Sequence, residues 1–257
     1  MPVDYPSGRL PDFLFLAASG YLNGVATLKK FGANPEVGTT EETIWDLGGK
    51  YNYPTVAAPL TVSSTDATDT AAGTGARTIS ISGLVDNSGS WDEFEVTVPM
   101  NGQTPVAVVP NCIRVFRAKV VTAGSAGRAN GNIHVGTGTV TGGVPAQTLA
   151  YIANGYNQTL MAIYTVPSGK RCYIREFFVT SGKAQFVTVL SKARSFGEVF
   201  QTKRVVGILG GNFIFKNEIP FVFEAKTDIE ISAFSDTAPV PIQAGFDMII
   251  ANAANYD

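Results

Sequence analysis

Apolar and polar residues alternate with a period of two from about residue 76 to the end of the chain. In the run ARTISISGL, Ile79 and Ile81 alternate with threonine and serine, and WDEFEVTVP repeats the pattern. Because successive side chains of a strand point to opposite faces, the pattern predicts strands with one buried and one solvated face. The intervening LVDNSGSW is rich in turn-forming residues, so these two runs are expected to form a hairpin.

The second half of the chain continues this pattern, with turn signals about every ten residues, as in β-sandwiches and barrels. Pro220 interrupts one run and is expected at an edge strand or a bulge, since proline cannot donate a ladder hydrogen bond. No stretch keeps a helical period, and at most Leu10–Leu16 forms a short turn of helix. Charged residues are 16% of the chain, below the usual value of about 25%, and 27 glycines favour many turns.

The predicted fold class is therefore all-β, with two β-sandwich domains preceded by an extended N-terminal arm. A chain of 257 residues is long enough for two such domains. We expect the arm at residues 1–20, the first β domain at 21–143 and the second at 144–257. The segment GTGTVTGGVPAQ, rich in glycine and threonine, is the expected linker.

The segment FGANPEVGTTEETIWDLGGKYNYPT, residues 31–55, shows neither a helical stripe nor strand-like alternation. We expect it to run in extended form over a β core and to touch a second chain. Its Trp45, beside Ile44, has two interpretations. It caps the core of its own chain, or it anchors a partner, as buried aromatic residues do at interfaces.

The residues offer little for catalysis. The single histidine, His134, lies in a short strand with no nucleophile motif, and a structural role is expected for it. One histidine and two distant cysteines, Cys112 and Cys172, cannot close a zinc site, and reduced, buried thiols are expected. The alternating oxygens of DNSGSWD are explained by a hairpin turn better than by a calcium loop. We therefore expect no enzyme, no metal and no cofactor.

Charged residues are expected on solvated faces. Asp228 and Glu230 alternate with isoleucines on a predicted strand, and so do not indicate a buried carboxylate pair of the glycosidase type. Lys29 and Lys30 are interpreted as solvated strand positions. With a net charge of −2 and no block of basic residues, no nucleic-acid partner is expected. The apolar run at Phe13–Ala18 is too short to span a membrane and follows no basic region, so no membrane partner is expected either.

Several phrases together resemble a family of virion structural proteins of tailed phages that infect cyanobacteria and other aquatic bacteria. They include FGANPEVGTTEETIWDLGG, DATDTAAGTGARTISISGL, RAKVVTAGSAGRANGNIHV and GYNQTLMAIYTVPSGK. The phrase KNEIPFVFEAKTDIEISA, near the C-terminus, also resembles jelly-roll domains of phage head and tail proteins. The resemblance extends from about Phe31 to Asn252 and carries no catalytic residues.

The resemblance implies jelly-roll-like domains and a capsid decoration, or cement, protein. Such a protein is made in the host cytoplasm and ends on the capsid surface of the virion. Its expected partners are the major capsid protein and itself, as a homotrimer. The expected interface residues are Phe13, Leu14, Phe15, Leu16, Ile44 and Trp45. The alternative is a tail or head-fibre protein that binds host carbohydrate, with Tyr151, Tyr156 and Asn157 lining the site.

Overall fold

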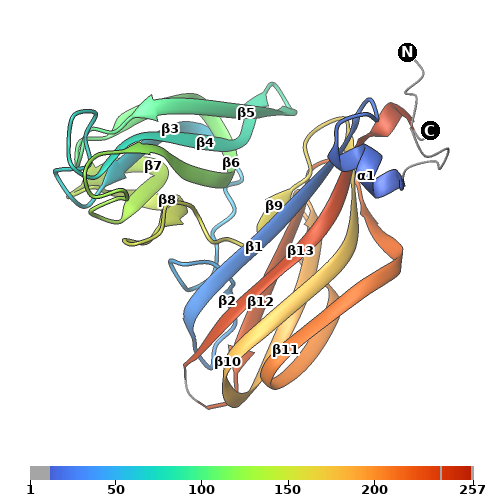
Figure 1. Cartoon of the computed structure of the whole chain (residues 1–257). Coiled ribbons are helices and arrows are strands. Elements are labelled where there is room, and N and C mark those ends of the chain that lie inside the picture. The colour runs from blue at the N-terminus through green and yellow to red at the C-terminus, as the bar shows by residue number, and fades with distance from the viewer. Residues whose placement is uncertain (1–11, 238, 256–257) are drawn as a thin grey trace, which may run out of the picture.

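A computed structural model of the chain describes residues 12–237 and 239–255, and these form two β-sheets (Figure 1). The expected all-β class is confirmed. One sheet has six strands in the order β5-β4-β6-β3-β7-β8. Its strands are β3 (Ala58–Ser64), β4 (Ala76–Asn87), β5 (Ser90–Pro99), β6 (Val106–Ala123), β7 (Ile133–Thr141) and β8 (Val144–Ile152).

The second sheet has seven strands in the order β1-β13-β10-β12-β2, with β11 paired to β10 and β9 paired to β12. The strands are β1 (Val25–Val37), β2 (Glu42–Thr43), β9 (Ile163–Thr165), β10 (Lys170–Ser195), β11 (Gln201–Phe223), β12 (Thr227–Ser235) and β13 (Val240–Asn252). Helix α1 (Phe13–Ala18) precedes β1, and a 3-10 turn (Ala253–Asn255) follows β13.

The six-stranded sheet is inserted into the seven-stranded one, which corrects the expected domain boundaries. Strand β1 pairs with β13, so residues expected in the first domain belong with the C-terminal strands. The expected boundary at 143–144 and the expected linker fall within the β7–β8 hairpin. Gly142 and Gly143 both have positive φ there, as the tight turn of a two-residue hairpin requires. The chain instead passes between the domains before β3 and after β8 (Figure 1).

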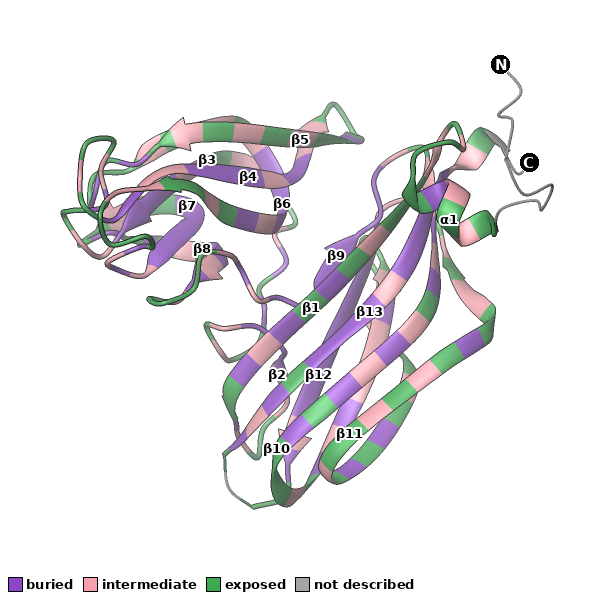
Figure 2. Cartoon of the chain, in the orientation of Figure 1, coloured by how far each residue is buried: buried purple, intermediate pink, exposed green. Residues whose placement is uncertain are grey.

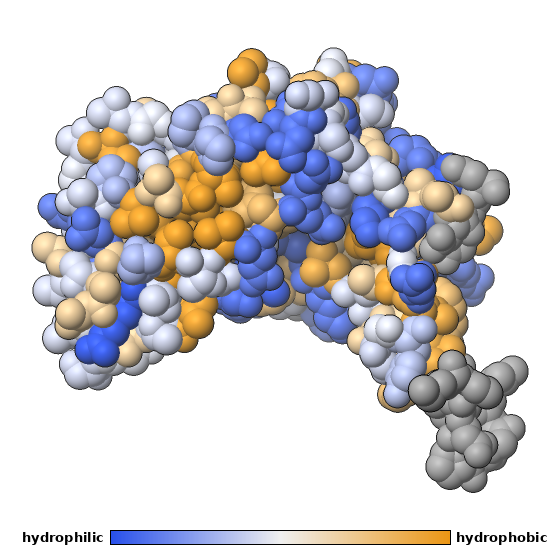
Figure 3. All heavy atoms as spheres, turned by 90° about the horizontal axis from the view of Figure 1, so that it is seen from above, coloured by the Kyte–Doolittle hydropathy of each residue, from blue (hydrophilic) through white to orange (hydrophobic). Residues whose placement is uncertain are grey.

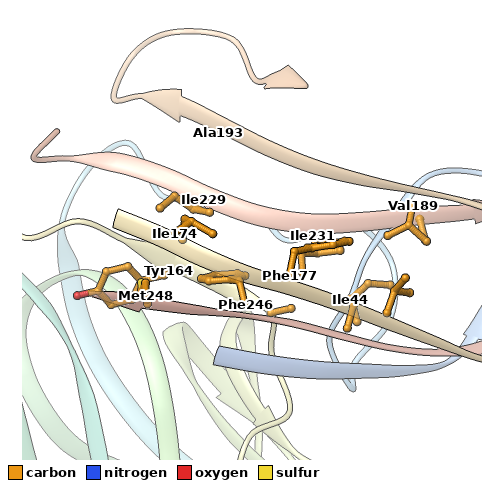
Figure 4. Close-up of a cluster of buried hydrophobic side chains, with 14 of the residues drawn as sticks. Ile44, Tyr164, Ile174, Phe177, Val189, Ala193, Ile229, Ile231, Phe246 and Met248 are labelled. Carbon is orange, nitrogen blue, oxygen red and sulfur yellow. The ribbon is translucent and has the colours of Figure 1, made fainter. Parts of the chain in front are cut away.

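The β10–β11 hairpin folds the seven-stranded sheet into two layers. The first half of β10 pairs with β13, its second half pairs with β12, and β11 follows it along both. At the corner, residues 182–185 stand opposite Gly210 alone, and Gly210 and Gly211 both have positive φ. The core lies between the layers, where Ile229 and Ile231 of β12 face Phe177 and Phe246 (Figure 4).

Strand β1 corrects the expectation that residues 31–55 contain no strand, because residues 31–37 belong to it. The sequence hides this strand because three of its four buried positions, Lys30, Gly32 and Asn34, are polar or small, whereas Phe31 is exposed. A side chain on Gly32 would overlap the backbone of Ile44. Because glycine has no Cβ, the segment that contains Ile44 can pass directly over β1 at this point.

The six-stranded sheet curls around a core of its own, visible as the purple strands β4 and β7 in Figure 2. Buried Asp69 fastens its loops by accepting hydrogen bonds from the hydroxyl of Ser64 (2.5 Å) and the backbone N–H groups of Ala76, Asn130 and Gly131 (2.7–3.0 Å). The expected hairpin at LVDNSGSW is confirmed as β4–β5.

Candidate functional site

A network of buried charges lies where the inserted domain meets the two-layered one. Arg114 of β6 comes from the inserted domain, and Asp228 and Glu230 come from β12 of the other. Both carboxylates are buried, which corrects the expectation that they face solvent. The alternation correctly separates these two carboxylates from the isoleucines of the core. Their own face of β12, however, is covered by the inserted domain and does not meet solvent.

Arg114 and Asp228 form the centre of this network. Their side chains are 2% and 0% exposed, and Arg114 donates from Nε and Nη2 to the two carboxylate oxygens at 2.8 and 3.0 Å. Asp228 also accepts from Thr165 (2.7 Å) and from Arg194 (3.2 Å), while Nη1 of Arg114 donates to the carbonyl of Pro54 (2.6 Å). Two-point pairing of this kind fixes orientation as well as distance.

A second group of charges continues the network along β10 and β12. Lys192 pairs with Glu230 at 2.8 Å and also with Glu41, and the hydroxyl of Tyr53 donates to Glu230 at 3.0 Å. Desolvation alone would raise the pKa of Glu41, but hydrogen bonds from Lys192 and Ser232 outweigh it and hold the pKa below its usual value. These carboxylates are all paired, so the arrangement suits a clamp between domains better than acid–base chemistry.

Residues 44–57, which connect β2 to β3 and are called the crossing segment, line the same junction with aromatic rings. The rings of Trp45, Tyr51 and Tyr53 follow one another edge to face at 5.1 and 4.7 Å, and Phe200 is next at 5.3 Å. Arg194 lies 4.5 Å from the Phe200 centroid, within cation–π range. Of the two interpretations of Trp45, the structure shows the first, because this residue is buried in its own chain.

Ile44 is likewise fully buried, so neither it nor Trp45 is exposed for a partner to contact.

Lys30 is a buried amine at this junction and not the solvated residue expected. It is 7% exposed, and it donates from β1 to the carbonyl of Phe116 on β6 at 2.5 Å. Burial, with a smaller contribution from the Arg117 charge, lowers the pKa of Lys30 to about 7. The neighbouring Lys29 is exposed, as expected, and pairs with Asp247 at 2.9 Å.

The remaining expected interface residues lie in helix α1, at the end of the two-layered domain where β1 begins (Figure 1). The short helix expected near Leu10–Leu16 is present, with the Asp12 side chain accepting from the N–H of Leu14 at its start. Phe13 and Phe15 are 46% and 58% exposed, while Leu14 and Leu16 are partly buried. Grooves of about 300 and 290 Å³ adjoin the helix over the outer face of the sheet. Figure 3 shows further apolar residues gathered over the inserted domain.

His134 and the two cysteines are buried and have structural roles. His134 is buried, meets the Thr148 hydroxyl at 3.1 Å and packs edge-on against Tyr151, and burial lowers its pKa. Cys112 and Cys172 are free and buried, as expected. In the described residues, no group of three or more metal-ligating side chains is placed to hold an ion. No helix in the described part is long and apolar enough to cross a membrane.

No family model matches the chain, and no curated protein matches it in sequence. Solved structures of infectious bursal disease virus show a faint likeness. The Gx strain structure has 10% identity and a TM-score of 0.26, covering 90% of this chain and 73% of that chain. A crystal structure of the VP2 subviral particle of this virus has 9% identity and a TM-score of 0.23, covering 96% and 75%.

Proposed function

We propose that the chain is a structural protein of a phage virion. It is a decoration protein that binds the outer surface of the head and stabilises contacts between major capsid subunits. Three observations support this: the likeness of its phrases to phage virion proteins, two β domains joined through a buried, bonded junction, and the exposed aromatic residues of helix α1. The junction gives the chain one fixed shape with which to span neighbouring subunits.

The exposed helix α1 is the observation that carries the proposal. Phe13 and Phe15 are about half exposed, although burying a phenylalanine contributes about 1.5–3 kcal/mol. Exposed aromatic residues beside grooves are typical of surfaces that a partner covers. We infer that α1 inserts against the major capsid protein, with the two phenylalanines as anchors.

Mass spectrometry of virions from the phage that encodes the chain tests the first part of the proposal. Hundreds of copies per particle are expected for a protein on the head lattice. A few dozen copies or fewer would place it on the tail or at vertices instead. Its absence from purified virions would refute any virion role.

Binding to empty shells tests the role of α1. The double substitution Phe13→Ser and Phe15→Ser is expected to abolish co-sedimentation with shells that lack the chain, because it removes both aromatic anchors. Tyr156→Ser, which removes a similarly exposed ring from the inserted domain, is the matched control and should bind normally. Normal binding by the double variant, with an unchanged melting temperature, would refute the proposal. Deletion of residues 1–50 is unsuitable because it removes β1 and β2.

The alternative proposal is a tail or head-fibre protein that binds host carbohydrate. The exposed ring of Tyr156, in the loop after β8, favours it, since sugars stack on such rings. Tyr151 packs on His134, and the Asn157 amide donates to the Gly127 carbonyl at 3.2 Å. A glycan array with the Tyr156→Ser control distinguishes the two roles.

We further propose that the chain is not an enzyme. Release of soluble fragments from host cell wall by the purified protein would contradict this.

A further inference from the structure

Strand β11 forms one whole side of the two-layered domain. Of the described strands it pairs with β10 alone, so its other edge has no strand partner along its 23 residues. Seventeen large apolar residues are exposed in the described chain, and eight of them lie between Phe186 and Val222. Figure 2 shows the exposed positions spread along β11. A long apolar edge of this kind attracts another strand unless it is protected.

The two halves of β11 differ in how well they are protected against pairing with another strand. In the half from 212 to 223, residues 217–220 bulge against a single residue of β10, and Pro220 lies in this bulge, as the sequence predicts. Lys216 and Glu218 add charges there. Bulges, prolines and charges are the features that natural edge strands use against unwanted pairing. In the half from 201 to 209, the run Val205–Leu209 has none of them.

The outer face of this unprotected run is apolar. Val205 and Leu209 are 61% and 69% exposed. Phe186, on the paired strand β10, is 44% exposed and lies over Gly207, where an added Cβ would come within 2.7 Å of its ring. The two edge strands of the inserted domain are different: β5 carries Glu93 and Glu95, and β8 carries Pro145.

We propose that two copies of the chain associate by pairing this half of β11 with its counterpart, antiparallel and centred on Gly207. In this register Val205 of each copy stands opposite Leu209 of the other, as an apolar cross-strand pair. Lys203 and Arg204 stand opposite Gly211 and Gly210, so no like charges face each other. The layer β12-β10-β11 then continues into the same three strands of the second copy.

The occupant is a second copy because the run is complementary to itself. A two-fold contact uses the same patch on both partners, and a charge-free run with glycine at its centre meets that condition. A five-residue strand pair buries less surface than the roughly 800 Å² per partner of a standard interface, so the dimer is expected to be reversible. This inference does not depend on the proposed virion role. It does differ from the homotrimer that the family likeness implies, since a two-fold contact closes at two copies.

Sedimentation velocity of the full chain over a concentration series tests the pairing. The wild type is expected to shift from monomer to dimer as concentration rises. The double variant Val205→Lys/Leu209→Lys places lysines opposite each other and is expected to stay monomeric. The double variant Val205→Lys/Leu209→Glu has a similar loss of apolar surface but places lysine opposite glutamate, and is expected to dimerise.

A control variant changes the protected half. Ile214→Lys should dimerise like the wild type, because it lies outside the proposed pair. Circular dichroism and the melting temperature establish that each variant is folded. A wild type that stays monomeric, or that forms trimers, overturns the proposal. Dimers of the lysine–lysine variant overturn it as well, and monomers of the lysine–glutamate variant overturn the register.

Discussion

Replacing Arg114 by methionine should destabilise the chain far more than removal of a surface charge. The substitution keeps an apolar side chain of similar length but leaves the buried carboxylate of Asp228 with Thr165 and Arg194 as its remaining side-chain donors. Breaking a buried ion pair from one side costs about 3–5 kcal/mol. Because two donors remain, we expect a loss of about 3 kcal/mol in the free energy of unfolding, measured by urea denaturation at pH 7.

The matched control lies on the same strand. Lys119 pairs with Glu95 at 3.3 Å, and both side chains are about half exposed, so Lys119→Met should cost less than about 1 kcal/mol. Asp228→Asn, alone and combined with Arg114→Met, completes a double-mutant cycle that isolates the pair. The reasoning would be refuted if Arg114→Met cost no more than the control, or if the cycle gave no coupling between Arg114 and Asp228.

Three further substitutions test the close approach of Gly32 to Ile44, the buried amine of Lys30 and the loop contacts of Asp69. Gly32→Ala should lower stability by about 1–3 kcal/mol, since its Cβ would overlap the carbonyl of Ile44, whereas Gly38→Ala meets no backbone atom and should be nearly neutral in thermal melts. For Lys30, with a folded pKa of about 7 against 10.5 when unfolded, the unfolded chain binds more protons between these values, so stability should rise with pH across this window. Lys30→Met should remove that rise in urea titrations at pH 7, 8.5 and 10, and an unchanged slope would contradict the burial argument. Asp69→Asn should cost about 2–3 kcal/mol by denaturation, because an amide presents N–H groups to surrounding donors.

The strands and hairpins were predictable because they depend on local alternation. The β4–β5 hairpin and the position of Pro220 both follow from neighbouring residues. The insertion of one domain in the other was not predictable in this way. It depends on pairing between Val25 and Ala251, at opposite ends of the chain, and nothing in the sequence near either residue specifies the other.

The candidate site was missed for a related reason. A period of two separates two faces of a strand, but it does not say whether the polar face meets water. Asp228 and Glu230 occupy the polar face of β12, which the crossing segment and Arg114 cover. In β1 the signal is reversed, since Lys30 and Asn34 point inward. The signal that the sequence offers is the irregular segment itself, where four charged residues between positions 41 and 50 precede two tyrosines: Glu41, Glu42, Asp46 and Lys50, then Tyr51 and Tyr53.

The buried junction links these observations to the proposed role. A protein that bridges neighbouring subunits gains most when its binding surfaces are already held at the right spacing, because flexible links lose entropy on binding. Arg114 and Asp228 hold the inserted domain against β12 of the two-layered domain, which also carries α1. Arg114→Met should therefore weaken binding to shells even in molecules that remain folded, although Arg114 is buried and touches no partner. Full binding by a folded Arg114→Met variant would mean that α1 acts alone and that the inserted domain contributes nothing to attachment.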